Sequence, residues 1–252
     1  MNQIKGLLID IDGVLVEDGH AIKGAVDHLN NLKHTYKVRL LTNTTTKTVG
    51  EIHQMLNQLG FDIHVQEIVT APVAAQLFLN TKGYSSIYPV VNANILSEFK
   101  AFRIDKNKPE AVVIGDIGKD WNYDLLNDIF KCLMIGAELV ALHKGKFWKS
   151  EGALQLDIGL FVNGLEFATG KKATVIGKPN HSFFEAALQG MELGKKEVIM
   201  IGDDIDSDVD GAQRFGIPGY LVQTGKYDEG FVSQSDVEPD QVIEGFKDLI
   251  LY

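Results

Sequence analysis

Short apolar runs alternate with helical patterns along almost the whole chain. Continuous runs of Val, Ile, Leu and Met are typical of strands that are buried on both faces of a parallel sheet. Such runs lie at 7–9, 38–41, 87–91, 111–114, 139–142, 174–176, 198–201 and 220–222. The pattern therefore predicts strands at these places.

Helices are predicted between the strands, because apolar residues there recur every three or four positions. Ile52 and Leu56, for example, share one face of a helix that ends at Gly60. Strands that alternate with helices predict the α/β class, with a doubly wound parallel sheet that has helices on both faces. The helices are expected at 24–34, 47–60, 71–82, 121–135 and 182–193.

Polar residues with useful chemistry follow four of the predicted strands. In an open α/β sheet, ligands bind at the carboxyl ends of the strands. We therefore expect one functional site that combines these four strand ends. The segments are LLIDIDGVL (7–15), RLLTNTTT (39–46), TVIGKPN (174–180) and VIMIGDDIDSD (198–208).

The first strand end carries two carboxylates. Asp10 and Asp12 flank Ile11, so an extended backbone points both side chains to the same side. Two carboxylates at that distance repel each other unless a cation neutralises them. An Asp-Gly turn at Gly13 is the structural alternative for this motif taken alone.

The densest acidic segment is DDIDSDVDG, which begins at Asp203. From Asp206 it resembles the start of an EF-hand loop, but the twelfth position is Ile217 where that loop needs Glu. A magnesium site at Asp203 fits better, because Mg²⁺ prefers a few carboxylates together with water. Asp204, Asp206 and Asp210 are expected to cap and tune a following helix.

Phosphate binding is indicated by the other two strand ends. Thr42 offers a hydroxyl, and backbone amides near Asn43 lie where a helix can begin. Lys178 supplies a fixed cation between Gly177 and Pro179. A helix cap and an ordinary loop lysine are the alternatives. Taken together, the four strand ends predict a phosphoryl-transfer site.

Composition narrows the classes of partner. The 252 residues carry a net charge of −10 with pI about 5.1, which disfavours nucleic acids and anionic membranes. The single cysteine, Cys132, excludes a disulfide framework and favours the cytoplasm, where we expect the thiol to be buried. We also expect no signal peptide and no transmembrane segment. The sequence leaves open whether the protein forms a homo-oligomer.

The ordered motifs D-I-D-G-V-L, L-T-N, G-K-P and G-D-D-I-D-S-D resemble those of the haloacid dehalogenase (HAD)-like hydrolases. The resemblance extends over the whole chain and implies a Rossmann-like core. It implies that Asp10 is a nucleophile that becomes an aspartyl-phosphate and that Asp12 is the general acid and base. The presence of Asp12 favours a phosphatase over a dehalogenase.

The same resemblance implies roles for the remaining motif residues. Thr42 and Lys178 would hold the phosphoryl oxygens of a small phosphorylated substrate. Asp203 would bind Mg²⁺ together with Asp10 and the backbone carbonyl of Asp12. Asp208 would orient Lys178 or a water on the metal. A phosphotransferase, or a binding protein with little turnover, would carry the same residues.

The long interval between the second and third motifs predicts an inserted domain. We expect a catalytic core at 1–78 and 178–252 and a smaller α/β cap at 79–177. This plan resembles subfamily IIA, the NagD-like and 4-nitrophenylphosphatase group, and within it the phospholysine phosphohistidine inorganic pyrophosphate phosphatase-like branch. The segment 156–161 departs from the glycine-rich turn that is common there, and we expect it to be a specificity loop.

Overall fold

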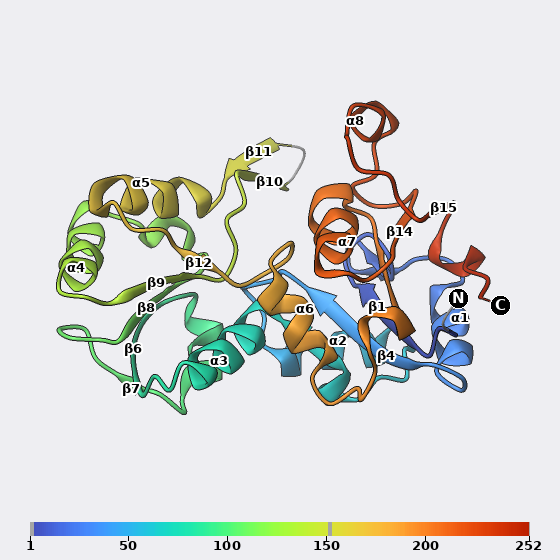
Figure 1. The fold of residues 1–252 in the computed structure, drawn as a ribbon, viewed down its shortest axis with the longest axis horizontal. Helices are drawn as coiled ribbons and strands as arrows, with labels where there is room; N and C mark the ends of the chain where they lie inside the picture. Colours follow the sequence, from blue (N-terminus) through green and yellow to red (C-terminus); the bar gives the residue numbers. More distant parts are fainter. Residues whose placement is uncertain (1–2, 151–152, 252) are drawn as a thin grey trace. The chain divides into compact units, whose positions relative to one another are not determined.

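The fold was obtained as a computed structural model that describes residues 3–150 and 153–251 (Figure 1). The chain divides into two compact units. The first contains the described residues up to Thr42, then Val49–Val69, then the chain from Lys178 onward. The second contains Asn43–Thr48 and Thr70–Gly177.

A six-stranded sheet forms the centre of the first unit, in the order β15-β14-β13-β1-β4-β5. Figure 1 labels four of its strands, β1, β4, β14 and β15. Strand β1 pairs in parallel with β4 on one side and β13 on the other. Its residues are buried on both faces, as expected for a central parallel strand. The strands are β1 (Gly6–Asp10), β4 (Lys37–Thr42), β5 (Ile68–Thr70), β13 (Val198–Gly202), β14 (Gly219–Val222) and β15 (Gln241–Ile243).

Helices pack their apolar faces on this sheet. In α2, for example, Ile52 and Leu56 are buried in the same cluster as Leu7 and Ile9 of β1. The helices of the first unit are α1 (Ala25–Leu32), α2 (Val49–Gln58), α6 (His181–Leu188), α7 (Gly211–Phe215) and α8 (Glu229–Ser233). A short hairpin, β2 (Val16–Glu17) and β3 (His20–Ala21), follows β1. Single helical turns lie at η1 (Val65–Glu67), η4 (Lys195–Glu197), η5 (Ile205–Asp210) and η6 (Phe246–Asp248).

The second unit has its own five-stranded sheet, in the order β12-β9-β8-β6-β7, and its strand pairs are parallel. Cys132 is buried in its core, as predicted. The strands are β6 (Ser86–Val90), β7 (Arg103–Ile104), β8 (Ala111–Ile114), β9 (Glu138–Ala141) and β12 (Thr174–Val175), with an antiparallel hairpin of β10 (Phe147–Ser150) and β11 (Ala153–Leu156). The helices are α3 (Ala71–Thr81), α4 (Tyr123–Met134) and α5 (Gly159–Thr169), with helical turns at η2 (Ala93–Phe99) and η3 (Gly118–Asp120).

The doubly wound α/β fold predicted from the sequence is confirmed, and each predicted strand and helix is present within a few residues. The largest difference is α6, which ends at Leu188 although the pattern continues to 193. Gly190 follows with φ +75, a left-handed conformation that ends helices. Helix α3 falls in the second unit, where it packs on η2, although the expected core boundary was 78.

Within residues 3–150 and 153–251, no helix has the length and apolar character needed to cross a membrane.

Candidate active site

The carboxyl ends of the central strands meet at one edge of the core sheet. Strand β1 ends at Asp10, β4 ends at Thr42, and Asp203 directly follows β13. Since β1 lies between β4 and β13 and runs parallel to both, these three residues share an edge. The parallel topology therefore assembles the site from segments far apart in the sequence.

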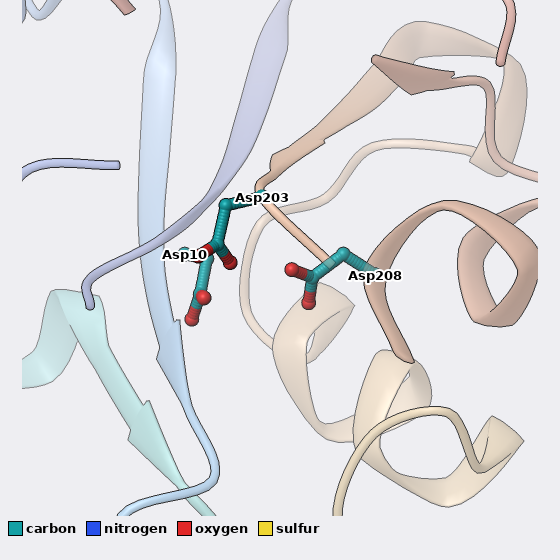
Figure 2. Close-up of side chains that lie close together, drawn as sticks. All are labelled: Asp10, Asp203 and Asp208. Carbon is teal, nitrogen blue, oxygen red and sulfur yellow. The ribbon is translucent and has the colours of Figure 1, made fainter. Parts of the chain in front are cut away.

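Three buried carboxylates converge at this edge. Asp10, Asp203 and Asp208 are 7%, 2% and 0% exposed, and they offer oxygens that all lie within 4.8 Å of one another. Figure 2 shows the three side chains turned toward a common point. Asp208 comes from the η5 turn, which follows β13. The three aspartates therefore form an acidic cluster that is buried from solvent.

Lys178 is the cation of the cluster. Its Nζ lies 2.6 Å from Asp10 Oδ1 and 2.7 Å from Asp208 Oδ1. Burial by itself lowers the pKa of this ammonium group, but the two carboxylates outweigh burial and hold the pKa above its usual range. Lys178 is therefore a permanent positive charge between two of the three acids.

One lysine does not neutralise three carboxylates. Burial raises the pKa of Asp203 to about 8, and the charges of Asp10 and Asp208 add to that rise. Burial also raises the pKa of Asp208 to about 7, even though Lys178 opposes it. Asp203 Oδ1 is buried and has no hydrogen-bond partner among the residues that the structure describes. An all-oxygen donor set with excess negative charge fits a hard divalent cation.

Thr42 and Asp12 lie beside this cluster. Thr42 is 2% exposed, and its Oγ1 donates a long hydrogen bond of 3.4 Å to Asp12 Oδ2. Asp12 itself is exposed, so its carboxyl group reaches solvent. Asn43 falls in the second unit, where its side-chain oxygen packs closely against Gly177. Of the predicted site residues, all except Asn43 belong to the core unit.

Two of the remaining acids of the 203–210 segment, Asp204 and Asp210, make structural contacts. Asp204 caps the η5 turn, because its Oδ1 accepts the backbone N–H groups of Asp206 and Ser207 at 3.1 and 3.0 Å. Asp210 forms an ion pair with Arg214 one turn later. The expected helix begins as the η5 turn at Ile205 and continues as α7. The capping role predicted for Asp204 is confirmed.

Sequence reasoning missed the turn after β14. The backbone N–H of Lys226 donates to Asp203 Oδ2 at 2.7 Å, and its Nζ lies 3.2 Å from Asp204 Oδ2. The residues Thr224 and Gly225 precede it in the same turn. The carboxyl end of the predicted strand 220–222 pointed to this edge of the sheet, but nothing in the local sequence indicated the backbone contact with Asp203.

The pKa of Asp203 gives a testable pH dependence. In metal-free protein, folded Asp203 keeps a proton that the unfolded chain releases from about pH 4, so folding stability falls as pH rises toward 8. Thermal unfolding in chelator should therefore show wild type losing Tm relative to Asp203→Asn across this range. Millimolar MgCl₂ should raise the Tm of wild type most at the alkaline end, where the carboxylates are ionised. A wild-type Tm that rises with pH relative to that of Asp203→Asn would contradict the raised pKa of Asp203.

Comparisons with known proteins agree with this geometry. Residues 7–105 match the haloacid dehalogenase-like hydrolase family, and residues 175–249 match the HAD-hydrolase-like family. Human phospholysine phosphohistidine inorganic pyrophosphate phosphatase is 37% identical over 254 residues, covering 98% of this chain and 93% of that protein. Bovine haloacid dehalogenase-like hydrolase domain-containing protein 2 is 40% identical over 225 residues, covering 89% and 86%.

Solved structures lead to the same group. A p-nitrophenyl phosphatase from Archaeoglobus fulgidus has a TM-score of 0.91 at 25% identity and covers 98% of both chains. NagD from E. coli K-12 has the same fold, with a TM-score of 0.89 at 24% identity over 99% of both chains. The chain therefore belongs to the haloacid dehalogenase-like hydrolases, in the NagD-like subfamily IIA.

Proposed function

We propose that this hydrolase is a magnesium-dependent phosphatase that acts on a small phosphorylated metabolite through an aspartyl-phosphate at Asp10. The observation that carries the proposal is the buried cluster of Asp10, Asp203 and Asp208 around Lys178. Such a cluster matches the needs of phosphoryl transfer, which depends on alignment and charge neutralisation. The phosphatases among the relatives support the same class of reaction.

In the first step, a carboxylate oxygen of Asp10 attacks the phosphorus atom of the substrate. The bond between phosphorus and the leaving oxygen breaks, and Asp12 gives that oxygen a proton. Thr42 and Lys178 hold the phosphoryl oxygens, and we assign the backbone amide of Asn43 to the same task. The product of this step is the aspartyl-phosphate together with the free alcohol.

In the second step, Asp12 takes a proton from a water molecule, which attacks the phosphorus atom of the aspartyl-phosphate. The bond between phosphorus and the Asp10 oxygen breaks, so phosphate leaves and the carboxylate is regenerated. Exposure of Asp12 suits this role, because the group must exchange protons with both the leaving alcohol and water.

A cation fits the carboxylate cluster. Asp10, Asp203 and the backbone carbonyl of Asp12 would hold Mg²⁺, with Asp208 orienting Lys178 or a bound water. Bound Mg²⁺ supplies charge neutralisation for the phosphoryl group and the nearby carboxylates. The buried and unpartnered Oδ1 of Asp203 supports this assignment within the described part of the chain.

We propose further that the second unit, which corresponds to the cap expected at 79–177 and also contains residues 70–78, acts as a cap that selects the substrate. The segment 156–161, which was expected to be a specificity loop, instead joins the end of β11 at Leu156 to the first turn of α5, which begins at Gly159. The exposed fraction of each side chain indicates which residues of the segment remain available to contact a substrate. Ile158 is 1% exposed and Phe161 stacks on Trp121 with ring centroids 4.1 Å apart, so both serve packing. Leu156 and Leu160 are 73% and 52% exposed, which makes them the side chains available for selection.

A panel of phosphomonoesters, pyrophosphate and phosphoramidates tests the proposed reaction. The purified protein, assayed with MgCl₂ and with chelator, should release phosphate from at least one phosphomonoester only when Mg²⁺ is present. An added alcohol that captures the phosphoryl group in place of water would indicate a phosphotransferase. Phosphate release no faster than that of an Asp10→Asn control would indicate a binding protein and end the phosphatase proposal.

A further inference from the structure

We propose that the turn formed by residues 224–226 is a positioning element for the metal site. The turn binds one carboxylate oxygen of Asp203 and leaves the other oxygen for the cation. This inference rests on the proposed function, because it takes Asp203 to be a metal ligand. It adds residues outside the four motifs to the machinery of the site. We call this segment the positioning turn.

The first argument is the close packing around Asp203 Oδ2. The backbone N–H of Lys226 donates to this oxygen at 2.7 Å. Two glycines pack against it, because a Cβ atom at Gly13 would lie 2.0 Å from Oδ2 and one at Gly225 would lie 2.1 Å from it. No side chain larger than hydrogen fits at either position without moving the carboxylate.

The second argument is that the positioning turn is fixed to the loop after β1. Thr224 Oγ1 donates to the backbone oxygen of Gly13 at 2.5 Å. A Cβ at Gly225 would approach Gly13 Cα to 2.5 Å, so the two backbones touch. Gly225 also has φ +63, a conformation that side chains disfavour. The turn therefore couples the loop that carries Asp12 to the Asp203 carboxylate.

The third argument is the contrast between the two oxygens of Asp203. Oδ2 accepts the backbone N–H of Lys226, whereas Oδ1 is buried without a hydrogen-bond partner among the described residues. The ammonium group of Lys226 is directed to Asp204, at 3.2 Å, so the turn contacts Asp203 through its backbone. A carboxylate held by one oxygen presents the other in a fixed direction, and loss of such support commonly costs a factor of about 10 to 100 in metal affinity.

Magnesium titration of chelator-stripped protein by calorimetry tests the proposal without any substrate. Gly225→Ala should raise the Kd for Mg²⁺ about 10- to 100-fold. Thr224→Val keeps the shape of the side chain and loses only the hydroxyl donor. This variant should also raise the Kd for Mg²⁺, but by a smaller factor. The matched control is Gly19→Ala, because Gly19 also has a positive φ of +77 but no heavy atom within 4 Å of an added Cβ.

The control separates backbone strain from the loss of positioning. Gly225→Ala and Gly19→Ala should both lower the Tm of metal-free protein, but only Gly225→Ala should lose the Tm increase that Mg²⁺ causes. If Gly225→Ala fails to fold, Thr224→Val alone decides the question. Wild-type affinity in Thr224→Val and in any folded Gly225→Ala, or equal loss in Gly19→Ala, would overturn the role of the turn. Wild-type protein that takes up no Mg²⁺ would overturn the proposed metal site together with this inference.

Discussion

Asp10→Asn is expected to abolish phosphate release, with a loss of roughly 10⁴-fold or more in turnover. An amide in place of the carboxylate cannot attack phosphorus, so no aspartyl-phosphate forms. The fold should survive, because Asn has nearly the same shape as Asp and Lys178 keeps its ion pair with Asp208 at 2.7 Å. Steady-state phosphate release at saturating MgCl₂ measures the effect, and circular dichroism verifies the fold.

Two further variants make this test specific. Asp27→Asn changes an exposed aspartate of α1 and should leave the rate unchanged. Asp12→Asn should also slow turnover severely, but Mg²⁺ binding should persist because the proposed contact of that residue is through its backbone. Activity of Asp10→Asn within tenfold of wild type would show that Asp10 is not the nucleophile.

Lys178→Met is expected to destabilise the folded protein by roughly 3–5 kcal/mol. Its side chain is 3% exposed and bonds to Asp10 and Asp208, so its removal leaves two buried carboxylates without their cation. For a chain of this size the corresponding fall in Tm is roughly 6 to 20 °C. Urea denaturation in the presence of chelator measures the free energy of unfolding, with exposed Lys23→Met as the control.

A second substitution should recover part of that loss. In the double variant Lys178→Met/Asp208→Asn one buried charge is absent, so the free energy of unfolding should rise above that of Lys178→Met alone. Activity should not return, because the proposed contact of Lys178 with the phosphoryl group is still missing. A Lys178→Met protein as stable as wild type, or a double variant no more stable than the single one, would contradict the ion-pair account.

The sequence predicted the central sheet because buried parallel strands have continuous apolar runs, such as 7–9 and 198–201. It missed β5 and β15, which are too short or too exposed to give such a run. In β15, Gln241 and Val242 are both exposed. In the central sheet, strand detection therefore succeeded for the four inner strands β14, β13, β1 and β4, and it failed for the two edge strands.

The site shows the same division. Asp10, Thr42 and Asp203 could be identified because strand ends position them and because their side chains carry the chemistry. Lys226 could not, because it contacts Asp203 through a backbone N–H that almost every residue possesses. Gly225 is required by a close approach between two backbones, which no local pattern reveals. Backbone contacts between segments that lie far apart in the sequence are therefore the features of the site that only the structure revealed.

The position of β1 in the sheet also affects how the protein is made. Strand β1 is paired on one side by β4, which follows it closely, and on the other side by β13, which is encoded almost two hundred residues later. At typical rates of translation, the backbone N–H and C=O groups along one edge of β1 stay without their strand partner for roughly 10 to 40 s. Throughout that interval the nascent chain carries an unpaired strand edge, which is the kind of surface that aggregates and that chaperones protect.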